Sequence, residues 1–427
     1  MITKEPSVSL VDLVLCLSDA VDLVSPELSN HHVRVAYIAF SIARELKYPD
    51  AKQVEIAMAG LLHDIGGLSL QSRLDAVDEV GDLRKHGELA FALLNTFEPL
   101  SSIATTIRYH MLPWPLIVEA EATGSTIPLD SHIIYIADRV AVLFDPKQSP
   151  LGQVKKIKTS IAERSGTVFN KGLVEALLSV ADKEYFWLDL ATSGLGLTIA
   201  DLLAGSTVHL GLDRLVNISK LFSSVIDFRS HYTATHSTSV AYLAKNLGRL
   251  AGFSARECLM LEAAGYLHDL GKLGVPAEIL EKPGKLTPDE FDVIRGHTFY
   301  SYRILQRLKE LDTINQWVSY HHERLDGAGY PFHISGSDLP LGSRIMAVAD
   351  VTSGITEDRP YRKAMDYKDA IKVLTSMAAR SALDGDIVQL MTSNVGEIDH
   401  VQRTARELAS IAYQNSIQTD VLANRHS

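Results

Sequence analysis

Residues 264–271 read Ala264-Gly-Tyr-Leu-His-Asp-Leu-Gly271, and residues 59–66 read Ala59-Gly-Leu-Leu-His-Asp-Ile-Gly66. In both octapeptides an apolar run closes on a His-Asp pair, and glycine stands two positions after the aspartate. Imidazole and carboxylate groups are costly to bury unless they are paired or bind a cation. The two stretches therefore predict related helical segments, each of which carries potential metal ligands into an apolar core.

The spacing of further histidines and aspartates repeats around the two octapeptides. The matching intervals are 32 residues from His31 to His63 and from His236 to His268, 24 residues from His86 to His110 and from His297 to His321, and 28 or 29 residues from His110 to Asp138 and from His321 to Asp350. Intervals of this length predict a duplicated domain rather than a solenoid, because each copy is long enough to enclose its own core.

Apolar residues recur at three- and four-residue spacing through most of both halves, which predicts helices. Examples are the stretches 33–46, 240–250 and 294–308, whereas alternating strand patterns are scarce. Gly and Pro mark loops at 282–285, 327–331 and 340–342. We expect an all-α fold of two domains, residues 1–200 and 208–427, with the boundary inside Thr192–Asp213.

The composition limits the classes of protein and ligand. Over 427 residues, 46% are hydrophobic and 22% charged, as in a globular protein with large cores. Cys16 and Cys258 are the only cysteines, which excludes a disulfide scaffold and a cysteine zinc site. Asp12, Asp19 and Asp22 interrupt the apolar stretch 8–24, so we expect an amphipathic helix there, no membrane partner and a cytoplasmic protein. The net charge of -11 argues against long nucleic acid but allows a small phosphate ligand.

Several separated strings in residues 227–406 resemble those of the HD-GYP family of cyclic dinucleotide phosphodiesterases, a subgroup of the metal-dependent HD phosphohydrolases. They are Tyr232-Thr-Ala-Thr-His-Ser237, His268-Asp-Leu-Gly-Lys-Leu-Gly-Val-Pro276, Lys282-Pro-Gly-Lys-Leu-Thr287, His321-His-Glu-Arg-Leu-Asp-Gly-Ala-Gly-Tyr-Pro331, Ala349-Asp350 and Arg359-Pro-Tyr-Arg362. A lone His-Asp pair would mean little, but this ordered set is specific. The resemblance implies two tandem HD-type helical domains, of which 208–427 is the catalytic HD-GYP domain.

The potential ligands of the second half suit first-row divalent metals, because imidazoles outnumber carboxylates. By resemblance, one ion would be held by His236, His268, Asp269 and Asp350, and a second by His297, His321 and His322, with Asp269 bridging the two. Iron or manganese is expected, and magnesium, nickel or zinc could use the same ligands. Two such ions can activate a bridging water and hold the scissile phosphate.

Three departures from the family pattern bear on this expectation. Tyr232 stands where some members place a glutamate for a third metal, and a phenol is a poor ligand at neutral pH, so we expect two metals. Thr298 follows His297 where proline is common, and Ser353 replaces a common acidic residue. Both lie outside the expected ligand set and affect substrate fit and tuning more than metal binding.

Asp269 and Lys272 are the expected catalytic residues, and the resemblance implies substrate contacts from Lys272, Tyr330, Arg359 and Arg362. Lys272 lies four residues after His268, close to the same helical face if the helix continues, so its ammonium can meet a phosphate oxygen. Arginine forks suit phosphates, and a tyrosine can stack on a base. The two arginines could equally be solvated charges at a helix start.

The implied activity is hydrolysis of a cyclic dinucleotide, cyclic di-GMP being the usual substrate of the family, to a linear dinucleotide with or without further cleavage to mononucleotides. A mixed substrate, 3′,3′-cyclic GMP-AMP, is the first alternative, because base choice depends on a few pocket contacts. A non-catalytic nucleotide-responsive binding module is the second. An HD phosphohydrolase acting on mononucleotides is disfavoured by the Gly-Tyr-Pro segment.

The first half, 1–200, reads as a degenerate HD-type domain. It has potential metal ligands at the repeat positions, namely His31, His63, Asp64, His86, His110 and Asp138. Gly67 stands at the position of Lys272 and Met111 at that of His322, which should disable phosphodiester cleavage. Either one metal is retained in a structural or regulatory role, which we favour, or the polar groups bond internally. Regulation through a homodimer is compatible with this reading.

Overall fold

The structure is a computed structural model that describes residues 6–24, 30–67, 83–206, 208–227, 235–358 and 362–423. Within these ranges nearly every element is a helix, and two short strands, β1 (Val8–Ser9) and β2 (His209–Leu210), pair with each other. The expectation of an all-α fold is confirmed. The chain divides into an N-terminal unit, mainly residues 9–208, and a C-terminal unit, mainly residues 209–415.

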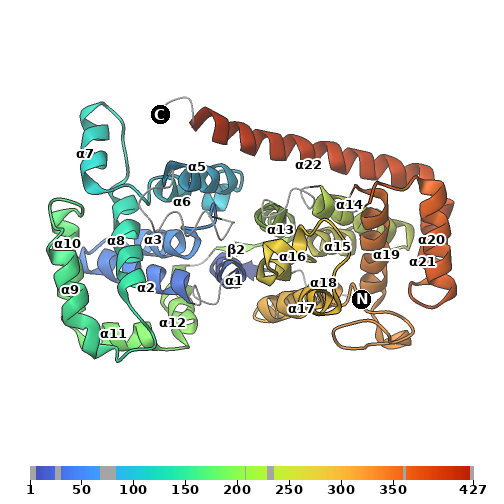
Figure 1. The fold of residues 1–427 in the computed structure, drawn as a ribbon, viewed down its shortest axis with the longest axis horizontal. Helices are drawn as coiled ribbons and strands as arrows, with labels where there is room; N and C mark the ends of the chain where they lie inside the picture. Colours follow the sequence, from blue (N-terminus) through green and yellow to red (C-terminus); the bar gives the residue numbers. More distant parts are fainter. Residues whose placement is uncertain are drawn as a thin grey trace. The chain divides into compact units, whose positions relative to one another are not determined.

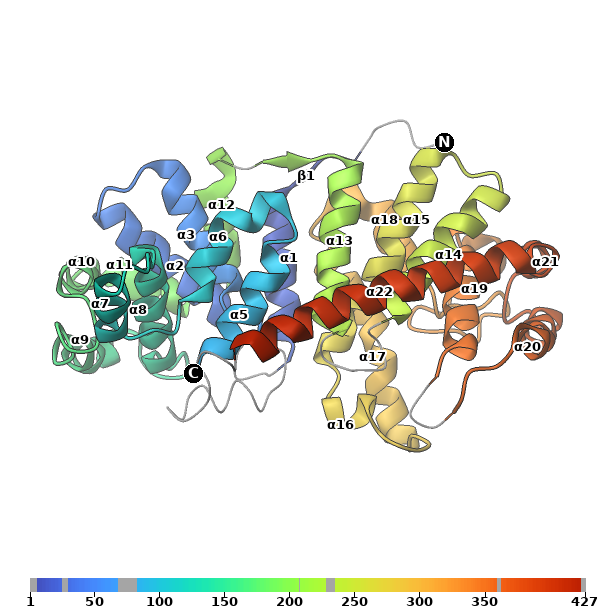
Figure 2. The same cartoon turned by 90° about the horizontal axis from the view of Figure 1, so that it is seen from above.

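The N-terminal unit is built from a succession of short helices (Figure 1). Its elements are α1 (Leu10–Asp22), α2 (His31–Glu45), α3 (Asp50–Leu62), α5 (Leu83–Leu94), α6 (Glu98–Arg108), α7 (Trp114–Ala122), α8 (Leu129–Leu143), η2 (Leu151–Gln153), α9 (Val154–Ala162), α10 (Lys171–Ala181), α11 (Glu184–Ala191), α12 (Leu195–Leu203) and η3 (Ala204–Ser206). Helix α2 packs against α3 and α8, and 13 of its 15 residues are buried. This trio forms the centre of the unit (Figure 2).

The C-terminal unit repeats this arrangement with different lengths. Its elements are α13 (Leu212–Asp227), α14 (His236–Leu250), α15 (Ala255–Leu267), η4 (Leu270–Gly274), α16 (Ala277–Leu280), α17 (Pro288–Leu305), η5 (Lys309–Leu311), α18 (Asp312–Ser319), η6 (Gly336–Asp338), α19 (Leu341–Thr356), α20 (Tyr367–Ala379), α21 (Gly385–Ser393) and the start of α22 (Val395–Ala423). Helix α14 packs against α15 and α19, as α2 does against α3 and α8.

Glycines of the two octapeptides explain why the duplicated helices approach so closely. A Cβ atom at Gly265 would lie 2.3 Å from the Cα atom of Ala241 in α14, and one at Gly60 would lie 2.7 Å from that of Ala36 in α2. Such distances leave no room for a side chain, so glycine is required where the two helices cross. The spacing within each octapeptide is therefore set by backbone packing as well as by chemistry.

The structure adds detail to two local expectations. Residues 10–22 form the expected amphipathic helix α1: ten of its 13 residues are buried, and the three that are not buried are Asp12, Asp19 and Asp22. The expected boundary region contains α12, because Leu195, Ile199 and Leu203 recur on one helical face and are all buried.

Among the described residues no single helix is long and apolar enough to cross a membrane. The pair α11 and α12 meets the length and composition test only when the two helices are taken together, and they are bent by 115° relative to each other.

Candidate metal centre

The seven expected ligands of the C-terminal unit come from five separate positions around its core. His236 is the first residue of α14, His268 follows the last residue of α15, and His297 lies within α17. His321 and His322 follow α18, and Asp350 lies within α19. Gly271 allows α17 to cross next to the His-Asp pair, since a Cβ there would lie 2.0 Å from the carbonyl oxygen of His297.

Asp269 lies between two groups of imidazoles. Its Oδ2 atom is 3.2 Å from His268 Nε2, and its Oδ1 atom is 3.5 Å from His297 Nε2. On one side, His236 Nε2 lies 3.2 Å from Asp350 Oδ1. On the other side, the Nε2 atoms of His297 and His321 lie 3.4 Å apart. The two oxygens of Asp269 thus face different halves of one cluster.

Backbone carbonyls fix the protonation of three of these rings. The Nδ1 atoms of His268, His297 and His321 lie 2.7, 2.6 and 2.5 Å from the carbonyl oxygens three residues earlier in the chain. A carbonyl oxygen only accepts, so each Nδ1 atom carries the proton and each neutral ring presents an Nε2 lone pair. The lone pairs of His297 and His321 therefore point toward the same space.

Two residues that the sequence reasoning did not select hold His236. Its Nδ1 atom lies 3.1 Å from Ser353 Oγ and 3.2 Å from Glu357 Oε2, and the serine hydroxyl donates to Glu357 Oε1 over 2.9 Å. A carboxylate behind a metal-binding histidine sets its tautomer and raises its basicity. Glu357 lies one turn after Ser353 and supplies the acidic group that the family pattern led us to expect at Ser353.

The electrostatics favour neutral imidazoles and ionised carboxylates. Burial lowers the pKa of His297 to about 3 and lowers the pKa of His321 well below its ordinary value. Burial alone would raise the pKa of the Asp269 carboxyl, but His268 and Lys272 beside it hold that pKa well below its ordinary range. These are the protonation states that metal ligands need.

The side chains of this cluster are arranged as divalent cations require. His268 Nε2 and Asp269 Oδ1 are buried and have no hydrogen-bond partner among the described residues. Facing lone pairs and carboxylate oxygens repel one another unless a cation lies between them. Ligand atoms within 4.8 Å of one another form three overlapping groups, His236-His268-Asp350, His268-Asp269-His321 and His297-His321-His322.

A cavity of about 810 Å³ lies beside this cluster. Its lining includes four members of the cluster, His236, Asp269, His322 and Asp350, and four cationic side chains, those of Lys272, Lys282, Lys285 and Arg362. Apolar side chains also line it, among them Ile279, Leu280, Leu286, Phe291 and Ile294. The volume is within the range of small-molecule sites, and cations together with apolar side chains suit a ligand that carries both phosphates and planar bases.

Comparison with known proteins gives the family. Residues 28–143 and residues 220–387 each match a family described as HD domain. Over 401 residues the chain is 30% identical to the 3′3′-cGAMP-specific phosphodiesterase 1 of Vibrio cholerae serotype O1, an alignment that covers 91% of this chain and 93% of that protein. The chain belongs to the HD-GYP family of cyclic dinucleotide phosphodiesterases.

Two further comparisons cover 46% and 91% of this HD-GYP protein. A cyclic di-GMP phosphodiesterase of Thermotoga maritima is 30% identical over 197 residues, 46% of this chain and 53% of the relative. The crystal structure of a cyclic GMP-AMP specific phosphodiesterase in V. cholerae superposes with a TM-score of 0.64 at 24% identity, covering 91% of this chain and 98% of that one. The second comparison shows a shared fold.

The residues of the HD-GYP domain that were expected to contact the substrate lie in different environments from one another. Lys272 lies in η4, since α15 ends before His268 and does not continue as the sequence argument assumed, and its Nζ atom donates to Asp269 Oδ2 over 2.6 Å. Arg362 lines the cavity while two of its nitrogens donate to the carbonyls of Gly354 and Ile355. Arg359 and Tyr232 lie outside the described residues.

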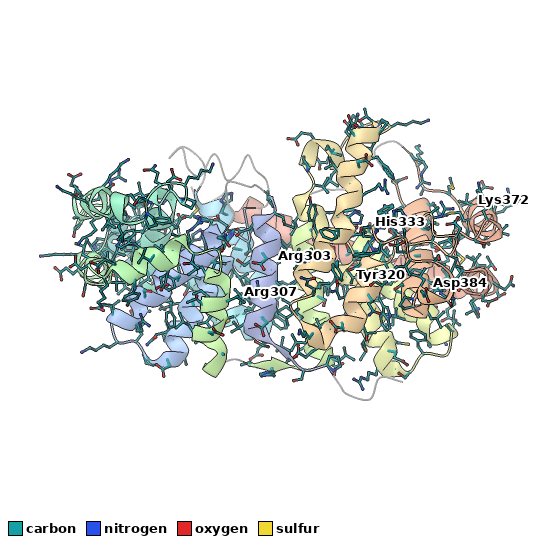
Figure 3. All side chains as sticks on the ribbon, turned by 90° about the horizontal axis from the view of Figure 1, so that it is seen from below. Arg303, Arg307, Tyr320, His333, Lys372 and Asp384 are labelled. Atoms are coloured by element: carbon teal, nitrogen blue, oxygen red, sulfur yellow. The ribbon has the colours of Figure 1, made fainter. Side chains whose placement is uncertain are left out.

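The Gly-Tyr-Pro segment of the HD-GYP motif is a tight loop that packs against the cluster. The Tyr330 ring lies 4.9 Å from that of His322. Gly327 has φ of 75°, and a Cβ at Gly329 would lie 2.4 Å from the Cα atom of Glu323. The buried Glu323 carboxylate accepts from the backbone amides of residues 332 and 334, which fixes the end of the loop near His333 (Figure 3). Sequence reasoning identified the two glycines but not Glu323.

In the N-terminal HD domain, five of the six expected ligands come together, and one additional histidine joins them. The five residues lie within 4 Å of at least one other member of the cluster; they are His31, His63, Asp64, His110 and Asp138. His32, which sequence reasoning did not select, lies 3.9 Å from Asp64. His86 lies in α5 and is in none of the described groups of ligand atoms within 4.8 Å.

Proposed function

We propose that the C-terminal unit hydrolyses one phosphodiester of a 3′,3′-linked cyclic dinucleotide, opening the ring to a linear dinucleotide. The observation that carries this proposal is that members of the predicted ligand cluster line a cavity together with four cationic side chains and several apolar ones. Family membership gives the reaction class, and the cavity supplies a place for a ring with two phosphates and two bases.

Two divalent transition metals are the proposed cofactors, with iron or manganese as the first candidates. His236, His268, Asp269 and Asp350 would hold one ion, and His297, His321 and His322 the other, with Asp269 shared between them. When bound, two such ions make a water more acidic and withdraw charge from the scissile phosphate.

The protein side chains orient and neutralise the substrate. Lys272 can exchange its bond to Asp269 for one to a phosphate oxygen, since its ammonium carries three donors and lies on the cavity wall. Arg362 lines the cavity, and two carbonyls hold its guanidinium and limit its movement. Phe291, one of the apolar side chains that line the cavity, is 46% exposed and offers a face for base stacking.

The favoured substrate is 3′3′-cGAMP, and cyclic di-GMP is the second candidate. A relative that aligns over 91% of this chain is 3′3′-cGAMP-specific, whereas the T. maritima cyclic di-GMP phosphodiesterase aligns with 46% of the chain. A few contacts to the exocyclic groups of one base separate the two substrates. Only the mixed substrate contains adenine.

The test is hydrolysis of a panel of cyclic dinucleotides by the metal-loaded protein, with products separated by chromatography. His268→Ala combined with Asp269→Ala should abolish turnover and lower the metal content. Asp399→Ala combined with His400→Ala is the matched control, because it removes an adjacent Asp-His pair from a partly exposed part of α22 that contacts Arg403 and not the cluster. Full activity in the first double variant, or no hydrolysis of any cyclic dinucleotide by the parent protein, would eliminate the proposal.

A further inference from the structure

Four cationic side chains line the cavity of the C-terminal unit, and three of them are bonded to other groups of the protein. Lys272 and Lys282 each donate to a carboxylate, and Arg362 donates to two backbone carbonyls. The fourth cation is Lys285, which is exposed and whose ammonium has no hydrogen-bond or ion-pair partner among the described residues. A ligand phosphate can therefore meet the charge of Lys285 without displacing a protein group.

Lys285 lies in the loop 281–287, which joins α16 to α17 and is held on both sides of the lysine by one carboxylate. The Glu290 carboxylate accepts from Lys282 Nζ over 2.6 and 2.8 Å and from the backbone amide of Thr287 over 2.7 Å. Thr287 Oγ1 in turn accepts from the amide of Glu290 over 3.3 Å, which closes a capping box at the start of α17. The backbone around Lys285 is thus anchored, while its side chain is available to a ligand.

The substrate class proposed above carries two phosphodiesters, of which one is cut. That phosphate has to reach the metal cluster, where Lys272 is bonded to Asp269. Arg362 is tied to two carbonyls of α19, the helix that carries Asp350. The other phosphate keeps its negative charge inside the cavity, and a charge removed from water is costly unless it is paired. The cations that remain for it are the two lysines of the loop 281–287.

We propose that Lys285 forms a second phosphate subsite, which binds the phosphodiester of the cyclic dinucleotide that is not cut. This inference rests on the proposed function and adds a recognition residue to it. An ammonium on a flexible stem presents three donors and can follow either non-bridging oxygen of the phosphate. Lys282 is the positioning residue of the subsite, because its ion pair with Glu290 anchors the loop. The subsite favours ligands with two phosphates over ligands with one.

A contact to the uncut phosphate should appear in KM and not in kcat. The uncut phosphate does not change during the reaction, so its contact with Lys285 is equally strong in the bound substrate and in the transition state. Lys285→Met removes the charge and keeps an unbranched side chain. It should raise KM for the cyclic dinucleotide that the parent hydrolyses by about 5–50-fold and leave kcat unchanged. Lys285→Arg keeps the charge and should restore most of the affinity.

A linear dinucleoside monophosphate with the same two bases separates a charge contact from a change in the loop. This compound contains one phosphodiester and no second phosphate, and it is added as a competitive inhibitor of cyclic dinucleotide hydrolysis. Its inhibition constant should be the same for the parent and for Lys285→Met. An equal rise in the inhibition constant and in KM would assign the effect to the loop structure and overturn the subsite.

Lys372→Met is the matched control for the loss of an exposed lysine in the same unit. Lys372 lies in α20, pairs with Asp369 and is not among the described residues that line the cavity (Figure 3). Its KM should equal that of the parent. A parent-like KM in Lys285→Met would overturn the subsite and leave the proposed function standing. Absence of hydrolysis of any cyclic dinucleotide by the metal-loaded parent would instead overturn the proposed function, and the subsite with it.

Discussion

Glu357→Gln tests whether a buried carboxylate behind His236 sets the affinity of the metal centre. The Glu357 side chain is 6% exposed and lies 3.2 Å from His236 Nδ1, and His236 Nε2 faces Asp350 on the other side of the ring. A carboxylate makes Nδ1 the protonated nitrogen and increases the basicity of Nε2. Glutamine keeps the size of the side chain but removes its charge.

The expected loss can be worked from hydrogen-bond strengths. A bond to a charged group contributes roughly 1.5–3 kcal/mol and a bond between neutral groups roughly 0.5–1.5 kcal/mol, so the substitution removes about 1–1.5 kcal/mol. This corresponds to a decrease in metal affinity of about tenfold, at the lower end of the 10–100-fold typical of residues that orient a ligand. Ser353→Ala removes a neutral partner of the same nitrogen and should have a smaller effect.

The assay is competition for manganese or zinc between the protein and a chromogenic chelator. Glu397→Gln is the control, because Glu397 is an exposed residue of the same unit that pairs with Arg249 and accepts from Asn246. Exposed ion pairs contribute at most about 1 kcal/mol and this one does not contact the cluster, so its metal affinity should equal that of the parent. Parent-like metal affinity in a natively folded Glu357→Gln protein would refute the orienting role.

Three further predictions follow from individual contacts. Burial raises the pKa of Asp227 to about 8, so folding favours its protonated form, and the stability that this group contributes is lost as pH rises from about 4 through 8. In urea denaturation the metal-free parent should therefore lose roughly 1.4 kcal/mol of unfolding free energy per pH unit between pH 5 and 7, relative to Asp227→Asn. Parallel plots of unfolding free energy against pH for the two proteins would contradict this. Gly329→Ala should lower stability by about 1–3 kcal/mol and reduce turnover because its Cβ meets Glu323, whereas Gly284→Ala has open space and should be neutral in the same denaturation assay. Phe291→Ala should raise KM by roughly 5–150-fold, as expected for one lost stacking contact, with metal content unchanged; an unchanged KM would remove Phe291 from the substrate site.

The ligand cluster was predictable because metal-binding residue types recur in the sequence at fixed intervals. His, His-Asp and Asp in the same order in two halves define the duplicated scaffold, and helical periodicity defines the elements that hold them. The seven side chains predicted as ligands in the second half do come together in space. Long-range convergence followed from the repeat, since a repeated spacing is hard to explain unless both copies build the same core.

Groups that act through another residue were not predictable in the same way. Glu357 and Glu323 each bond to a side chain or backbone whose position depends on tertiary packing, and a lone glutamate in a helix or loop carries no signal of its own. The His32 signal was visible, since it follows His31 directly, but only the Asp22 contact explains which way the ring points. The end of α15 before Lys272 is likewise a feature of the structure, in which the α17 backbone lies against Gly271.

A retained His-Asp pair does not by itself identify a hydrolytic domain. Gly60 and Gly66 in the N-terminal unit meet the same kind of backbone as Gly265 and Gly271, so backbone packing accounts for these glycines in both copies. The surroundings of the two pairs differ. In the C-terminal unit Lys272 lies beside Asp269 and a cavity with cationic side chains, and in the N-terminal unit Arg139 pairs with Asp138 and His32 lies near Asp64. We therefore expect the duplicated scaffold to set where an ion binds, and the surrounding residues to decide whether a phosphate reaches it.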